Sequence, residues 1–286
     1  MKRIGISCKL NDRRASELAM QLRDWLQAKK CRVLMDEVLG AGIGDTMPLA
    51  EMPGQVELMI VLGGDGTLLH VARRFAGAEA PILGINLGRL GFLTDTPVGS
   101  MFDVVDDVLR GHFKIKRHFT LTTESWRGDN LLSSGHAMND VVLQRNEQPR
   151  MIAFELYVRE HLVFRMRGDG LILATPAGST AYALSAGGAI VHPDVDAISV
   201  VPICPHTLSN RPIILPATDS IELRVVEAIG GAALNLDGQE HLELVVGDRV
   251  IVEKGPAVSL VYLPERHYFE VLRTKLHWAG QITDQN

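Results

Sequence analysis

The hydrophobic pattern divides the chain into two parts of different character. Between residues 3 and 110, short apolar runs alternate with stretches of helical spacing. Apolar residues recur on one helix face between Ala15 and Leu26, and residues 101–110 form a second amphipathic stretch. The apolar runs at 3–7, 33–35, 58–62 and 82–85 have the length of buried strands. Alternating strands and helices predict a parallel sheet with crossover helices.

After residue 110 the pattern changes to the alternation that is typical of strands. Residues 112–123 alternate polar and apolar positions, and further strands are predicted at 140–144, 153–159, 198–201, 221–226 and 249–253. A loop is expected at 40–54, and a C-terminal helix at 265–278. The prediction is an α/β N-terminal domain with a parallel sheet, plus a mostly-β C-terminal domain. The first spans residues 1–114, with 265–286 packing back on it, and the second spans 115–264.

Composition narrows the functional classes. The chain has 286 residues, of which 46 % are hydrophobic and 22 % charged, so a sizeable core is expected. A net charge of −5 without a basic run argues against a nucleic-acid partner. Cys8, Cys31 and Cys204 lack the spacing of a disulfide framework or a zinc site, which fits a reducing compartment. No signal-peptide core or membrane-spanning run is found, so a cytoplasmic location without membrane association is expected.

The most informative motif is GGDGT at residues 63–67, directly after the apolar run 58–62. Its glycines allow close backbone approach to a ligand, and Asp65 is the only acid of the loop. The loop therefore has the character of a phosphate-handling turn with a built-in carboxylate. An ordinary strand-to-helix loop, with Asp65 capping a helix that starts near Thr67, is the alternative.

Two further clusters of polar residues precede or follow apolar runs. Asn139 and Asp140 stand before the run 141–143, where an amide and a carboxylate can hold a polar ligand, or simply form a turn. Residues 167–188 are denser, with RGDG, an apolar strand and then TPAGSTAYALSAGG. Their hydroxyls and small residues suit a polar, flat ligand. The alternative is a tightly packed helix start with Ser179 or Thr180 as N-cap.

These motifs, in this order, resemble those of the NAD kinases. The resemblance continues through PHTLSNRPIILP at 205–216 to Asp237, Gly238 and Gln239. It implies transfer of the γ-phosphoryl group of ATP, or of polyphosphate, to the 2′-hydroxyl of the adenosine ribose of NAD. It also implies Mg²⁺ or another divalent cation held largely by substrate phosphates, without an all-protein metal cage. A homo-oligomer, with a tetramer favoured, follows from the same resemblance.

The resemblance carries functional roles to particular positions. Asp65 is implied as the general base, Gly66 as a backbone contact, and His70 as a neighbour of the phosphates. Asn139 and Asp140 match the pair for the ribose and adenine end, although many members have Glu in place of Asp140. The other dinucleotide-contacting matches are Arg150, Arg167, Asp169, Thr180, Ala181, Tyr182, Ala183, Leu184, Ser185 and Gln239. A large residue at Arg167 implies a preference for NAD over NADH.

Other functions are less well supported by the sequence. There is no G-x-x-x-x-G-K-[ST] motif of a P-loop kinase, and no G-x-G-x-x-G follows a strand. Cys204 and His206 show no pattern of a nucleophile pair, and His206 is interpreted as structural. Two alternatives stay open: a lipid or sugar kinase sharing only the GGDGT loop, and a non-catalytic NAD(H)-sensing module. Asn139 and the TAY run argue against the first, and Asp65 against the second.

Overall fold

A computed structural model describes residues 2–39, 44–88, 91–94, 96–146, 150–207, 210–263 and 267–278. The chain forms two compact units. One comprises Met1–Arg117 and Ser259–Asn286, and the other comprises His118–Val258. The boundaries fall within two long strands, β7 (Lys114–Arg127) and β18 (Arg249–Tyr262). Each unit is described by itself.

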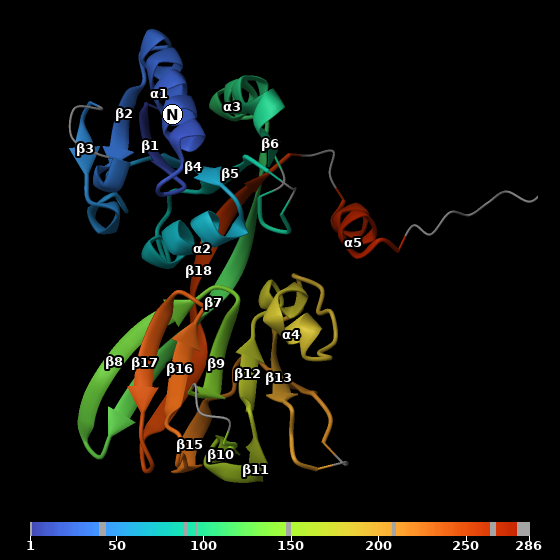
Figure 1. Cartoon of the computed structure of the whole chain (residues 1–286). Coiled ribbons are helices and arrows are strands. Elements are labelled where there is room, and N and C mark those ends of the chain that lie inside the picture. The colour runs from blue at the N-terminus through green and yellow to red at the C-terminus, as the bar shows by residue number, and fades with distance from the viewer. Residues whose placement is uncertain are drawn as a thin grey trace, which may run out of the picture. The chain divides into compact units, whose positions relative to one another are not determined.

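The first unit is built on a parallel sheet, as the alternating pattern predicts (Figure 1). Its strands run in the order β3-β2-β1-β4-β5, and β6 and the end of β18 both pair with β5. The helices are α1 (Arg13–Ala28) and α3 (Met101–Leu109) on one face and α2 (Asp65–Arg74) on the other. The strands are β1 (Arg3–Cys8), β2 (Arg32–Asp36), β3 (Thr46–Met47), β4 (Leu58–Gly63), β5 (Ile82–Asn86) and β6 (Thr96–Pro97).

The two faces of this sheet are buried differently. Ile4, Ile60 and Leu83 lie on the face that packs against α1 and α3. On the opposite face, a Cβ at Gly84 would lie 2.7 Å from a methyl group of Leu68 in α2. Both faces are therefore covered, which explains why the strands read as continuous apolar runs.

The second unit is a β-sandwich of two antiparallel sheets. One sheet contains β11-β10-β15-β18, with the hairpin β7-β8, and the other has the order β14-β13-β12-β9-β16-β17. This confirms the mostly-β prediction. The remaining strands are β8 (Asn130–Ala137), β9 (Asp140–Arg145), β10 (Ile152–Val158), β11 (His161–Gly168), β12 (Gly170–Ala174), β13 (Ala197–Ile203), β14 (Ile213–Pro216), β15 (Ile221–Glu227), β16 (Ala232–Leu236) and β17 (Glu240–Leu244).

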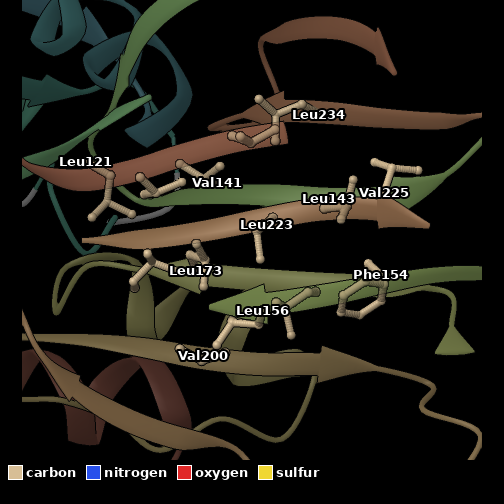
Figure 2. Packing of buried hydrophobic residues seen from close by; sticks show 14 of the residues in the cluster. Leu121, Val141, Leu143, Phe154, Leu156, Leu173, Val200, Leu223, Val225 and Leu234 are labelled. Atoms are coloured by element: carbon tan, nitrogen blue, oxygen red, sulfur yellow. The ribbon is translucent and has the colours of Figure 1, made fainter. Parts of the chain in front are cut away.

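Alternate residues of the two sheets fill the sandwich. Figure 2 shows Phe154, Leu156 and Leu223 of one sheet beside Leu143 and Leu173 of the other. The next positions of β9 and β12 face outward, where Val142 and Ile172 pack against Ala183 of the short helix α4 (Tyr182–Ser185). The middle strands β9 and β12 are thus buried on both faces. The burial of these two strands holds them in place, and with them the loops at their ends.

Several short elements differ from the sequence prediction. The loop expected at 40–54 contains strand β3 and the 3₁₀ turn η2 (Leu49–Glu51), while residues 40–43 lie outside the described ranges. The predicted C-terminal helix is α5 (Tyr268–Leu276), and Lys116 of the same unit lies 5.9 Å from the ring centroid of Tyr268. Further 3₁₀ turns are η1 (Glu37–Leu39), η3 (Val98–Ser100) and η4 (Gly178–Thr180).

Candidate active site

The GGDGT loop joins β4 to α2 at the carboxyl end of the parallel sheet. Gly63 is the last residue of β4, and a Cβ there would lie 2.3 Å from the Thr67 hydroxyl, so this position needs glycine for packing. Gly64 is the N-cap of α2, and Gly66 follows in the first turn. A Cβ at either position would meet no atom of the described residues within 4 Å, apart from its own chain neighbours and helix backbone. Packing against the described residues therefore does not require glycine at these two positions.

Asp65 does not cap α2, because the helix already begins at this residue. Its carboxylate accepts hydrogen bonds from the loop that follows β5. Oδ2 accepts from the backbone N–H of Phe92 at 2.8 Å, and Oδ1 from the N–H of Leu93 at 3.2 Å and of Thr94 at 2.9 Å. The Thr94 hydroxyl donates a further bond to Oδ1 at 2.8 Å. Asp65 is thus a half-buried, oriented acceptor.

His70 lies one turn further along α2 and is exposed. Asp65, Gly66 and His70 therefore share one helix in the first unit. This helix carries the residues that the resemblance assigns to the reacting end of the substrates.

In the second unit, the Asn139–Asp140 turn is held by the carboxylate of Asp237. Its Oδ1 accepts from the N–H of Asn139 at 2.7 Å and of Asp140 at 3.1 Å, and its Oδ2 from that of Met138 at 2.8 Å. The backbone of Asp237 has a left-handed φ of 52° and returns a hydrogen bond from its N–H to the Asp140 carbonyl at 3.0 Å. Hydrogen bonds in both directions between Asp237 and this turn therefore hold it in place, and the side chains of Asn139 and Asp140 take no part in them.

The polar side chains of this turn are left for other partners. Within the described ranges, the buried Oδ1 of Asn139 has no hydrogen-bond partner. Asp140 is 5 % exposed, and burial raises the pKa of its carboxyl group to about 7, with a further contribution from the Asp237 carboxylate. The turn therefore presents an unsatisfied acceptor beside an acid that titrates near neutrality.

This titration predicts a pH-dependent effect of Asp140→Asn on stability. The unfolded carboxyl has a pKa of 3.8, so between pH 4 and 7 only the folded chain holds the proton, and folding weakens as pH rises through this window. Asp140→Asn removes the free-energy cost of burying an ionised carboxylate. Its free energy of unfolding should exceed the wild type's above pH 7, by at most about 4 kcal/mol at about 1.4 kcal/mol per pKa unit.

Thermal unfolding of both chains at pH 5 and pH 8 checks this expectation. The difference in Tm should be larger at pH 8 and should shrink at pH 5. Equal differences at the two pH values would show that Asp140 is not protonated in the folded chain.

The segment after β12 packs directly on the same turn. The Thr175 N–H donates to the Asn139 carbonyl at 2.9 Å, and the Thr175 hydroxyl to the Met138 carbonyl at 2.7 Å. A Cβ at Gly178 would lie 2.0 Å from the Asn139 carbonyl oxygen, which is why this close approach needs glycine. The segment and the turn therefore form one structure.

Most hydroxyls of this segment form hydrogen bonds within the protein itself. Ser179 is fully buried, donates to the Pro176 carbonyl at 2.6 Å and accepts from the Val191 N–H at 2.9 Å. Thr180 donates to the Ala177 carbonyl at 3.0 Å. Within 180–185, Ala183 is buried, Tyr182 and Ser185 are exposed, and Thr180, Ala181 and Leu184 are half-buried. Only part of this run can present side chains to a ligand.

A cavity of about 770 Å³ lies at the other end of β9 and β12. Asp169 lines it, and its carboxylate accepts from Nε of Arg145 at 2.8 Å. This volume is in the range of small-molecule sites. The described residues that line it are Gln144, Arg145, Asn146, Asp169, Tyr182, Ile203, Gly230, His241 and Glu243.

The remaining candidates are Arg150, Arg167 and Gln239. Arg150 is exposed and precedes β10. Arg167 on β11 is 56 % exposed and forms an ion pair with Glu227 at 3.3 Å. Gln239 is exposed in the turn between β16 and β17, two residues after Asp237. None of the three lines the cavity.

Sequence reasoning missed three residues that hold the candidates in place: Thr94, Arg145 and Asp237. Asp237 was named only as part of the motif that continues to Gln239, without a role of its own. The available signal was position, because Arg145 directly follows the predicted strand 140–144 and Thr94 lies in a glycine-containing loop after another.

Other kinds of site find little support in the described ranges. No group of three or more His, Cys, Asp or Glu side chains there could hold a metal ion. Cys8, Cys31 and Cys204 form no disulfide bond in the described ranges. None of the helices in the part that the structure describes is long and apolar enough to cross a membrane.

Comparison with known proteins assigns both parts of the chain. The ATP-NAD kinase N-terminal domain family matches residues 4–113, and the ATP-NAD kinase C-terminal domain family matches residues 138–262. NAD kinase of Magnetococcus marinus is 40 % identical, covering 99 % of this chain and 95 % of the relative. NAD kinase of Geobacter metallireducens is 39 % identical, covering 98 % and 99 %.

Two solved structures are also similar. A yeast NADH kinase complexed with NADH has a TM-score of 0.90 and 28 % identity, covering 100 % of this chain and 90 % of that one. An Archaeoglobus fulgidus NAD kinase in complex with ATP has a TM-score of 0.75 and 26 % identity, covering 97 % and 100 %. Fold and site thus define a phosphotransferase. The chain belongs to the NAD kinase family.

Proposed function

We propose that this chain transfers the γ-phosphoryl group of ATP to the 2′-hydroxyl of the adenosine ribose of NAD, forming NADP and ADP. The observation that carries the proposal is the Asp65 carboxylate, which is held directly after β4 between two glycines that packing against the described residues does not require. Family membership supports the substrates, since the similar structures were determined with NADH and with ATP.

In this reaction Asp65 accepts the proton of the ribose hydroxyl. The hydroxyl oxygen forms a bond to the γ-phosphorus while the bond to the bridging β–γ oxygen breaks, and ADP leaves. Because such transfer has a loose transition state, positioning contributes more than deprotonation. The lack of a Cβ at Gly64 and Gly66 suits close approach of the substrates.

We assign dinucleotide binding to the second unit. Asn139 Oδ1 and Asp140 offer an acceptor and a titrating acid at one end of β9, where the resemblance places the ribose and adenine. Asp169 and Tyr182 line the cavity at the other end. Arg145 is five residue steps along β9 from Asp140, or about 17 Å at the usual rise of about 3.4 Å per residue. An extended dinucleotide matches this scale.

A divalent cation, with Mg²⁺ favoured, is expected to accompany the donor phosphates. Such an ion is often held by substrate oxygens, water and one or two carboxylates. The ion would supply charge neutralisation on the phosphates.

Preference for NAD over NADH is the expected consequence of Arg167. The guanidinium lies on β11 and pairs with Glu227, so its side chain has a defined direction. Arg167→Gly should raise the kcat/KM for NADH relative to that for NAD, because the steric barrier to the reduced ring is removed. Paired initial-rate measurements with both dinucleotides check this. An unchanged ratio would remove Arg167 from the discrimination.

We also propose that the chain forms a homo-oligomer, with a tetramer favoured. The edge strand β14 and the edge strand β11 carry exposed apolar residues, including Ile214 and Leu162, and such edges favour pairing with another chain. Light scattering of the purified protein measures the subunit number.

A coupled assay with an NADP-specific dehydrogenase tests the main proposal. NADP should form from NAD, ATP and Mg²⁺, and a parallel reaction with polyphosphate identifies the donor. Protection against thermal unfolding by NAD, but not by a lipid or sugar, separates this activity from that of a lipid or sugar kinase. Protection without NADP formation from either donor would indicate an NAD(H)-sensing module instead.

A further inference from the structure

We propose that Thr94, oriented by Asn86, is the positioning residue that directs Oδ2 of Asp65 toward the substrate hydroxyl. This inference rests on the proposed function, since it concerns the same carboxylate. It assigns a role to the last side chain of β5 and to one in the loop that follows, neither of which belongs to the predicted binding residues.

The topology brings this loop to Asp65. Strands β4 and β5 are parallel neighbours, and Gly63 pairs in register with Asn86. Their carboxyl ends therefore lie side by side, so the loops that follow them meet. The approach is tight, because a Cβ at Gly91 would lie 1.9 Å from Oδ1 of Asp65. The Gly91 N–H donates to the Thr94 carbonyl at 2.9 Å, which closes the loop on itself.

The direction of each hydrogen bond in this network is determined. The Oδ1 of Asn86 accepts from the Gly88 N–H at 2.7 Å, so its Nδ2 must face Thr94. That Nδ2 donates to the Thr94 hydroxyl at 2.9 Å and to the Thr94 carbonyl at 3.2 Å. A hydroxyl that receives this bond directs its own proton to the Asp65 carboxylate, which only accepts. Both Asn86 and Thr94 are buried, so water does not compete freely for these bonds.

The two carboxylate oxygens of Asp65 receive different numbers of hydrogen bonds. Among the residues that the structure describes, Oδ1 receives three donors, whereas Oδ2 receives only the Phe92 N–H. Each carboxylate oxygen has about two acceptor sites. Oδ1 is therefore saturated, and Oδ2 keeps one site for a further donor. The Thr94 hydroxyl fixes which oxygen is left for the substrate.

Thr94→Val removes the hydroxyl and keeps the shape of the side chain, while Thr94→Ser keeps the hydroxyl and serves as the matched control. In the coupled NADP assay, Thr94→Val should lower kcat by between about 10- and 100-fold, the range of small misplacements of reacting groups. The KM for NAD should change by less than about three-fold, because the second unit supplies the assigned dinucleotide contacts. Thr94→Ser should restore at least half of the wild-type kcat.

Circular dichroism melts accompany the kinetics, and kcat is normalised to folded protein. If Thr94→Val does not fold, Thr94→Cys replaces it, since a thiol of similar size is a weak donor, and the same loss of kcat is expected. A wild-type kcat in a folded variant without the hydroxyl, or an equal loss in Thr94→Ser, would overturn the inference. Failure of the wild type to form NADP would instead count against the proposed function itself.

Discussion

Asp65→Asn is expected to lower kcat for NADP formation by about 10² to 10⁴-fold, the usual loss when a general base is removed. The structure also predicts a loss of stability, which would not be expected if Asp65 were an exposed acid in a loop. If the amide oxygen takes the three donors that now bind Oδ1, the amide nitrogen faces the Phe92 N–H, so a donor meets a donor. The variant should therefore also lose about 1 to 3 kcal/mol of unfolding free energy.

Steady-state kinetics with both substrates, together with denaturant unfolding, measure the two effects. His70→Asn is a suitable control because His70 lies on the same helix and is exposed, so its replacement should leave the unfolding free energy nearly unchanged. A folded Asp65→Asn enzyme that keeps a third or more of the wild-type kcat would remove the assigned role from Asp65.

Asp237→Ala is expected to raise the KM for NAD by about ten-fold or more, because the Asn139–Asp140 turn loses the carboxylate that accepts its three N–H groups. Stability should fall by about 2 to 4 kcal/mol, since these donors lose a charged acceptor and Ala is disfavoured at a left-handed φ.

Asp237→Asn provides the matched control. Asparagine tolerates the same backbone conformation and keeps one acceptor oxygen, so its KM and unfolding free energy should lie between those of the wild type and Asp237→Ala. Titration with NAD followed by calorimetry, beside denaturant unfolding, separates binding from folding. An unchanged affinity for NAD in folded Asp237→Ala would show that the turn does not bind the dinucleotide.

The fold class was predictable because the core positions carry regular periods. The apolar runs 58–62 and 82–85 correspond to β4 and β5, and residues 101–110 to α3. Strand β18 was predicted only as far as residue 253, since Gly255 and Pro256 suggest a break. In the structure the strand continues to Tyr262. Gly255 lies against β7, where a Cβ would be 2.4 Å from the Thr122 hydroxyl, so this glycine allows close packing and does not end the strand. Such a long-range contact leaves no local signal.

The candidate site was predictable where chemistry sits in one motif. GGDGT and Asn139–Asp140 are short motifs beside predicted strands, so the local sequence is enough to identify them. Their supports are distant in sequence: Asp65 is bound by residues 92–94, and Asn139 by Asp237. The hydroxyls of Thr175 and Ser179 illustrate the converse. In the sequence they resemble donors to a ligand, whereas in the structure they donate to backbone carbonyls of the chain. Only the three-dimensional pairing distinguishes these uses.

The central claim is tested most directly by phosphorus NMR of the product formed from NAD, ATP and Mg²⁺. The proposed reaction predicts one new phosphomonoester resonance, coupled to the 2′-proton of the adenosine ribose and appearing in step with ADP. A phosphate on any other hydroxyl, or ADP and free phosphate without a phosphorylated dinucleotide, would contradict it.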